Sequence, residues 1–334
     1  MAASPRKMWL VPSGLRQPIL HQDPGVPAWL SRFCIVPALS LLNRLAADTA
    51  CRVGGSLGVL VFHLGLRRRT AGQQLGLMMG LKGTRRRDIL RRAYATMGAN
   101  FVELLAVGGP DGPEHHFEVR NPTWLAQTLA RHPRALFLAG HLGSWDIGAH
   151  TVTRITGRVV VYAKPQHDPE IDALANRQRA RLNLHVVFTG TDDKSAALEA
   201  TRAMRTGIPL ALMADQRPHH RDGAPAWWFD QPAWVLPGPA FFCHRMKAAV
   251  IPGVCLRYRA GRMAAVVGRP FQAEGRDQAV LVQRGADLLA AMIAAHPGQY
   301  FWHHRRIGGQ PPAPVAPRSD SPWRRGMRLL AERW

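Results

Sequence analysis

The chain has 334 residues, 46% of them hydrophobic, and a formal net charge of +22 at pH 7. A chain of this length and composition can bury a substantial core, as one large domain or two lobes. The charge implies an anionic partner, and no helix-turn-helix, zinc-finger or stacked-aromatic RNA motif accompanies it, so we expect a membrane surface or an acidic protein and no nucleic acid.

The N-terminal third of the chain is expected to be helical and basic. Residues 1–28 indicate an irregular segment without a secretory signal, and residues 29–110 indicate a helical, membrane-associating region. Its apolar stretch at 53–66 is followed by Arg67, Arg68 and Arg69 and is shorter than the ~20 residues that span a bilayer. Two interpretations remain open for this stretch, a shallow membrane anchor or a buried helix of the fold, and we favour membrane association over spanning.

Residues 111–310 predict an α/β domain. Strands and helices alternate there, which indicates a largely parallel mixed sheet with helices on both faces. The expected strands are 135–139, 158–163, 184–189, 208–213, 248–256 and 263–268, and the expected helices are 144–155, 169–182, 193–206, 237–246 and 276–295. Residues 311–334 are expected to form a Pro-rich linker and a basic amphipathic tail, which is either a second membrane contact or a solvated tail.

The cysteines and paired histidines give no metal pattern. Cys34, Cys51, Cys243 and Cys255 lack a Cys-x-x-Cys spacing and are expected to be buried free thiols. Adjacent histidines rarely converge on one ion. We therefore expect no metal site.

The segment that follows the 135–139 strand carries the candidate catalytic residues. His141 precedes Asp146 by five positions, and a histidine oriented by a carboxylate can act as a general base. Positions i and i+5 lie on different faces of a helix, so the pair can act together only if His141 lies on the loop and Asp146 in the first turn of the next helix. Backbone N–H groups near Gly143, or an arginine, are expected to stabilise the oxyanion. The alternative is a buried structural histidine.

Five blocks of residues follow one another along the chain. They are His141 to Asp146, Tyr162 to Pro165, the arginines Arg177, Arg179 and Arg181, the pair Asp215-Gln216, and Gln299 to Arg306. In this order they resemble the lipid A late acyltransferases (the lauroyl and myristoyl transferases), a branch of the lysophospholipid acyltransferase superfamily. The resemblance covers roughly residues 30–310. The chain departs from the usual pattern at Asp146, where this branch commonly has Glu, and at Ser144, where Asn is usual.

The resemblance implies an O-acyltransferase that moves a fatty acyl chain from an acyl carrier protein or CoA thioester to a hydroxyl of a glycolipid such as a lipid A precursor. It implies that His141 and Asp146 are catalytic, and that the thioester is a co-substrate with no further cofactor. It places the protein on the cytoplasmic face of a bacterial inner membrane, bound peripherally or by a shallow anchor. The residues expected to contact substrate are Gly143, Tyr162, Arg179, Arg181, Asp215 and Gln216.

Other functions remain open from the sequence. The departures from the family pattern lie around the acceptor and also fit a lysophospholipid or another glycolipid, such as phosphatidylinositol mannoside. A thioester hydrolase that uses His141 and a polyanion-binding protein are the remaining alternatives.

Overall fold

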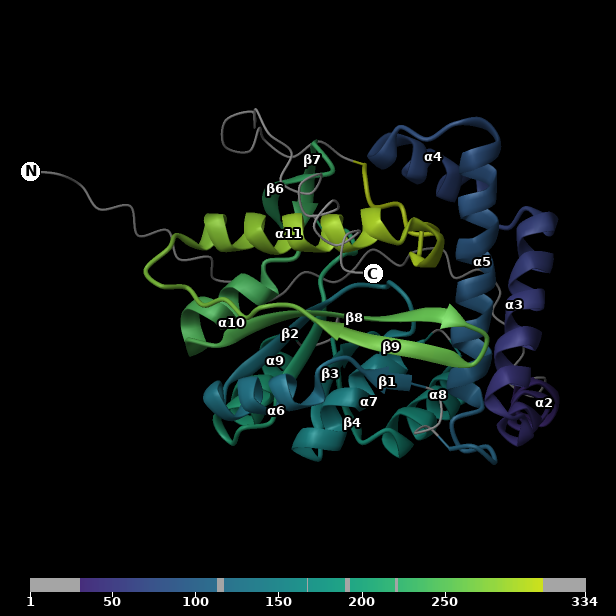
Figure 1. The fold of residues 1–334 in the computed structure, drawn as a ribbon, viewed down its shortest axis with the longest axis horizontal. Helices are drawn as coiled ribbons and strands as arrows, with labels where there is room; N and C mark the ends of the chain where they lie inside the picture. Colours follow the sequence, from purple (N-terminus) through teal and green to yellow (C-terminus); the bar gives the residue numbers. More distant parts are fainter. Residues whose placement is uncertain (1–30, 113–116, 167, 190–192, 220–221, 309–334) are drawn as a thin grey trace, which may run out of the picture.

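The computed structural model describes residues 31–112, 117–166, 168–189, 193–219 and 222–308. Within these ranges a seven-stranded sheet with the order β1-β9-β8-β2-β5-β3-β4 lies at the centre (Figure 1). All neighbouring strands are parallel except β8 and β9. The predicted mixed, largely parallel α/β sheet is confirmed. Its strands are β1 (Phe117–Val119), β2 (Ala135–Ala139), β3 (Val159–Ala163), β4 (Leu184–Phe188), β5 (Leu210–Met213), β8 (Ala249–Arg259) and β9 (Arg262–Val267).

Helices cover both faces of the sheet because its central strands are apolar on both sides. Along β2, Leu136 and Leu138 enter one buried cluster while Ala135 and Phe137 enter another, as the two-residue period of a strand requires. The first cluster is closed by α9 (Asp193–Arg205), α10 (Gly238–Met246) and α11 (Gln278–Ala295). The second is closed by α6 (Pro122–Arg131) and α7 (Trp145–Thr156), with α8 (Pro169–Arg181) packed beside β4.

The predicted strands and helices of this domain are all present, with ends within a few residues of the expected ones. The sequence did not predict β1, α6, or the hairpin of β6 (Ala224–Trp228) and β7 (Gln231–Val235). The hairpin turn has positive φ at both Phe229 and Asp230. The sequence Phe-Asp differs from the Asn-Gly and Asp-Gly pairs that favour such a turn, and both strands contain proline. The residue pattern therefore gave only a weak signal for a hairpin.

The helical N-terminal region folds as predicted, with α2 (Val36–Leu41), α3 (Ala47–Leu64), α4 (Arg68–Met79) and α5 (Gly83–Leu105). Figure 1 shows α3 lying along α5 at one side of the sheet. Glycines allow their backbones to touch. A Cβ added to Gly58 would lie 2.0 Å from the carbonyl oxygen of Tyr94, and one added to Gly98 would lie 2.1 Å from that of Gly54. Only residues without a Cβ fit at this crossing.

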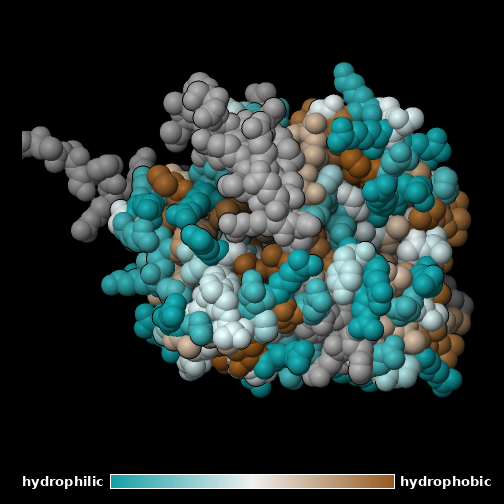
Figure 2. Space-filling model, viewed as in Figure 1, coloured by the Kyte–Doolittle hydropathy of each residue, from teal (hydrophilic) through white to brown (hydrophobic). Residues whose placement is uncertain are grey.

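The opposite face of α3 is apolar and exposed. Its side chains Val53, Leu57, Leu60 and Leu64 recur at helical spacing, and Leu64 is 75% exposed. Figure 2 shows hydrophobic residues at this side of the molecule beside hydrophilic side chains over α4 and α5. The interpretation as a buried helix of the fold is therefore right for one face of α3, whereas the shallow membrane anchor stays a prediction for the exposed face.

One helix of the described chain, α11, is long and apolar enough to cross a membrane, and more than half of it is buried in the core. A second segment passes the same test of length and composition only if α3 and α4, which are bent by 93° at their junction, are counted as one broken span. The predicted irregular N-terminus and basic C-terminal tail lie outside the described residues.

The prediction of buried thiols is right for three cysteines and wrong for the fourth. Cys51, Cys243 and Cys255 are buried free thiols, whereas Cys34 is exposed. Burial raises the pKa of Cys243 to about 11 and that of Cys255 to about 12, so both remain protonated at neutral pH.

The α3–α5 crossing predicts opposite effects for two glycine-to-alanine substitutions. Gly98→Ala should destabilise the protein by about 1–3 kcal/mol, because the new methyl group meets backbone atoms that cannot move aside. Gly55→Ala, whose Cβ would lie 3.8 Å from the carbonyl oxygen of Ala95, should be neutral or stabilising by up to about 1 kcal/mol through helix propensity. Denaturant unfolding measures both, and equal effects would contradict the packing at Gly98.

Candidate active site

The candidate site lies at the C-terminal ends of β2 and β5. His141 is on the loop that follows β2, and Asp146 is in the first turn of α7, as the five-residue spacing required. The carboxyl ends of parallel strands are where open α/β sheets place their ligands. The loop is therefore in a position suited to chemistry.

Asp215, and not Asp146, is the carboxylate on His141. The His141 Nδ1 and Asp215 Oδ1 atoms are 2.9 Å apart, and the two side chains are 17% and 1% exposed. Strand pairing creates this contact: Ala139 is opposite Met213, and the N–H of Ala214 donates to the carbonyl of Ala139. The predicted pairing of His141 with Asp146 is thus wrong, because the partner comes from the neighbouring strand.

Electrostatics favour the ionised form of Asp215. Burial alone would raise the pKa of Asp215, but the charge and hydrogen bond of His141 outweigh it and lower that pKa. The ionised carboxylate accepts a hydrogen bond from Nδ1–H of His141, so Nε2 is the ring nitrogen that can act on a ligand. The side-chain nitrogen of Gln216 lies 3.3 Å from Nε2, on the side that a substrate hydroxyl would approach.

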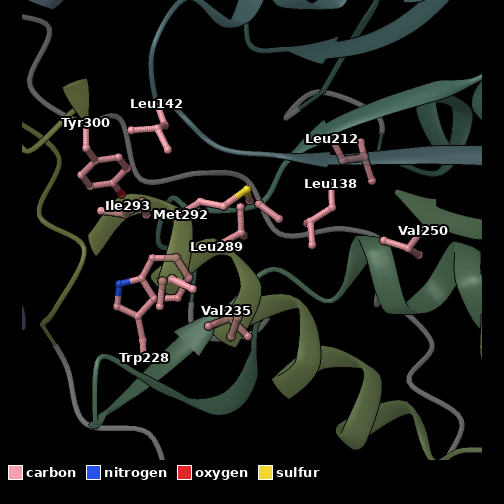
Figure 3. Close-up of a cluster of buried hydrophobic side chains, with 14 of the residues drawn as sticks. Leu138, Leu142, Leu212, Trp228, Val235, Val250, Leu289, Met292, Ile293 and Tyr300 are labelled. Atoms are coloured by element: carbon pink, nitrogen blue, oxygen red, sulfur yellow. The ribbon is translucent and has the colours of Figure 1, made fainter. Parts of the chain in front are cut away.

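Aromatic residues from the start of α7 and from the C-terminal block lie against the histidine. The rings of Trp145 and Phe301 lie 5.0 and 6.0 Å from the His141 ring, and the N–H of Phe301 donates to the carbonyl of His141. Tyr300 pairs with Leu142 as an isolated β-bridge and is fully buried. Figure 3 shows both side chains in the apolar cluster that supports the loop, together with side chains of α11.

Asp146 forms a different pair, with the predicted binding residue Arg179. Arg179 Nε lies 2.9 Å from Asp146 Oδ1, both side chains are 15% exposed, and Arg179 Nη1 donates to Asn176. The pair ties the start of α7 to α8. It leaves part of the guanidinium accessible to an anionic group.

Two residues predicted to contact substrate, Arg181 and Tyr162, have hydrogen-bond partners within the fold. Arg181 is exposed and donates to Asn43 and Gln178. The Tyr162 hydroxyl donates to the carbonyl of Ala196 on α9. Both contacts fix one element to another, and none of these partners belongs to the cluster around His141.

The N–H of Gly143 is also engaged. It donates to the carbonyl of Gln299 at 3.0 Å, and the next N–H, that of Ser144, donates to the carbonyl of Cys255 at 2.9 Å. An oxyanion role for the Gly143 N–H, as predicted, would require this hydrogen bond to break. Gly143 has φ +64°, and a Cβ there would lie 1.9 Å from the Cys255 oxygen, so this position requires glycine.

Comparison with known proteins agrees with the resemblance seen in the sequence. The family described as bacterial lipid A biosynthesis acyltransferase matches residues 26–307. This range covers helices α2 to α5, the sheet, and the Gln299–Arg306 block beside His141. No curated protein matches the chain significantly.

The histidines beside the site predict an acid-sensitive fold. Burial lowers the pKa of both His303 and His304 to about 4, and His304 Nε2 accepts the N–H of Arg217. The unfolded chain, with pKa near 6.5, binds more protons between pH 6.5 and 4, so stability from these groups is complete above pH 6.5 and is lost as the pH falls toward 4.

In His304→Gln, the side-chain oxygen can still accept from Arg217 but does not titrate. The free energy of unfolding should therefore fall less steeply between pH 6.5 and 4 than in the wild type. Denaturant titrations at several pH values measure the slope, with His63→Gln on the exposed side of α3 as the control. Parallel profiles for wild type and His304→Gln would contradict the assignment.

Proposed function

Since the chain belongs to the bacterial lipid A biosynthesis acyltransferases, we propose that it moves a fatty acyl chain from an acyl thioester to a hydroxyl of a glycolipid such as a lipid A precursor. The observation that carries the proposal is the hydrogen bond between His141 and the buried Asp215 at the carboxyl end of the sheet. This pair has the geometry of a general base with its orienting carboxylate.

In the proposed reaction, His141 Nε2 removes the proton of the acceptor hydroxyl as the oxygen attacks the thioester carbonyl carbon. Asp215 stabilises the imidazolium that forms and keeps Nδ1 protonated throughout. The C–S bond then breaks, and the leaving thiolate takes the proton from Nε2. A thiolate is a good leaving group, so this route requires no covalent intermediate on the enzyme.

Gln216 and Arg179 are the proposed substrate contacts. Gln216 lies against Nε2, where the acceptor hydroxyl must bind, so its amide can orient that hydroxyl. Arg179 is held by Asp146 and remains partly exposed, so its outer edge can bind a phosphate of the acceptor. In this scheme Asp146 positions Arg179 and does not act on the histidine.

The proposed donor is acyl carrier protein or acyl-CoA. Both are acidic, and the chain carries 44 basic against 22 acidic residues. The exposed arginines Arg85, Arg87, Arg91 and Arg92 lie together on the first half of α5. Such a cluster attracts either donor through long-range electrostatics, and it gives no preference between them.

The proposed location is the cytoplasmic face of the inner membrane. The exposed apolar face of α3 is followed by three arginines, Arg67 before α4 and Arg68 and Arg69 at its start. A helix that lies in the membrane interface typically places leucines in the acyl region and arginines at the level of the anionic headgroups. The acceptor lipid would then reach the site from the same surface.

The mechanism predicts different outcomes at the two carboxylates. Asp215→Asn should lower the rate of acyl transfer by roughly 10²–10⁴-fold, because the imidazolium loses its stabilising charge. Asp146→Asn should cost about tenfold or less and should act mainly on the acceptor KM, because a partly exposed ion pair is lost. A lauroyl thioester of acyl carrier protein and a lipid A precursor in detergent micelles supply the assay.

Glu199→Gln, which changes an exposed carboxylate on α9, is the matched control. A large loss of acyl-transfer rate in Asp146→Asn with little loss in Asp215→Asn would indicate that Asp146 is the carboxylate that acts with His141, and would contradict the proposal. Rapid thioester hydrolysis in the absence of the lipid acceptor would identify a hydrolase instead.

Membrane binding through α3 is tested separately. The double variant Leu57→Gln, Leu60→Gln should bind anionic vesicles roughly tenfold or more weakly, since each buried leucine contributes on the order of 1 kcal/mol. Vesicle sedimentation measures the change. Leu198→Gln on α9, a leucine that is equally exposed at 50%, should bind as the wild type does. Equal binding by all three proteins would exclude α3 as the contact.

A further inference from the structure

A buried polar network connects α5 to the loop that carries His141. Asn100 and Glu103 are one turn apart on the inner face of α5, and they are 8% and 0% exposed. A fully buried carboxylate is costly unless an opposite charge accompanies it. Arg257 of β8 supplies that charge, and its Nη2 donates to Glu103 Oε2 and, at 3.1 Å, to Asn100 Oδ1.

The arginine fixes which way the Asn100 amide points. A guanidinium can only donate, so the oxygen of Asn100 must face Arg257 and the nitrogen must face away from it. That nitrogen donates to the carbonyl oxygen of Gly143 at 2.5 Å. Because Arg257 donates to the amide oxygen, Asn100 presents its amide N–H to the loop, at the residue two positions after His141.

The backbone of Arg257 fixes the same loop from a second side. Its N–H and C=O bond both polar atoms of the Gln299 side chain, at 2.9 and 2.8 Å, and the carbonyl of Gln299 accepts the N–H of Gly143. The backbone N–H and C=O of Gly143 are thus bonded to Gln299 and Asn100, and both of these residues are hydrogen-bonded to Arg257. The loop has little freedom to turn about this point.

We infer that Asn100 is a positioning residue for His141, and that the Glu103–Arg257 ion pair serves to orient its amide. An apolar pair of similar volume would often stabilise a core as well as a buried ion pair does, so stability alone gives this pair no clear advantage. Orientation of the Asn100 amide does give the ion pair an advantage, because a general base displaced by about 1 Å can lose about 10²-fold in rate. The inference rests on the proposed role of His141.

Asn100→Leu removes the donor at nearly constant volume and tests the inference directly. Its kcat should fall roughly 10–100-fold, while KM for both substrates changes by less than about threefold. In the His141→Ala background the same substitution should have no further effect on the residual rate, because the histidine through which it acts is absent. Thr96→Val, which removes another buried side-chain donor to a backbone carbonyl from the same helix, should keep the wild-type kcat.

The double variant Glu103→Met, Arg257→Met covers the case in which Asn100→Leu does not fold. It replaces the ion pair by apolar side chains and retains the backbone bonds of residue 257 with Gln299. A folded double variant should show the same loss of kcat, again absent in the His141→Ala background.

Wild-type kcat in a folded variant, or an equal loss with and without His141, would overturn the inference and leave the proposed function standing. An undiminished rate in His141→Ala alone would overturn the proposed function, and the inference with it. The rate of the His141→Ala variant therefore distinguishes failure of the inference from failure of the proposed function.

Discussion

The hydrogen bond from His141 to Asp215 is the contact on which the site depends, and the sheet makes it possible. β2 and β5 are parallel neighbours, so the residues that follow them emerge side by side at one edge. Gly140 permits the approach, since a Cβ there would lie 3.3 Å from the side chain of Asp215. The His141–Asp215 pair is thus assembled from two segments 74 residues apart by the register of two buried strands.

Burial makes the same pair sensitive to its surroundings. Asp215 is almost fully enclosed, and an unpaired carboxylate there would take up a proton. It stays ionised because the charge and hydrogen bond of His141 lower its pKa. Asp215 in turn accepts a hydrogen bond from Nδ1–H and holds the orientation of the imidazole ring. The aromatic enclosure by Trp145 and Phe301 limits the access of water that would weaken this mutual dependence.

The sequence predicted most of the sheet and its helices because their signals are local. Apolar runs such as 135–139 and 248–256 are buried strands, and the alternation of strands with helices gives the parallel order. The carboxylate partner of His141 was predicted wrongly because the pattern His-x-x-x-x-Asp is also local, whereas strand neighbours are not visible in one sequence. The resemblance placed Asp215 in the site, but only strand pairing showed what it contacts.

Asn100, Glu103 and Arg257 escaped prediction for a related reason. On α5 the glutamate stands within the apolar run Phe101 to Leu105, and a buried acid in such a run is a signal that a partner is required. The sequence cannot name that partner, because Arg257 is one of many arginines and lies 154 positions away.

With α3 as the proposed membrane contact, the N-terminal helices connect the bilayer to the candidate site. The α3–α5 crossing at Gly58 and Gly98 brings the two backbones into contact, and α5 contacts the His141 loop through Asn100. A close backbone contact of this kind has little room to slide, because any side chain at Gly58 or Gly98 would collide with the other helix. The apolar face that α3 presents outward is therefore rigidly related to His141. A lipid acceptor whose depth is set by that face would meet the base at a defined height above the bilayer.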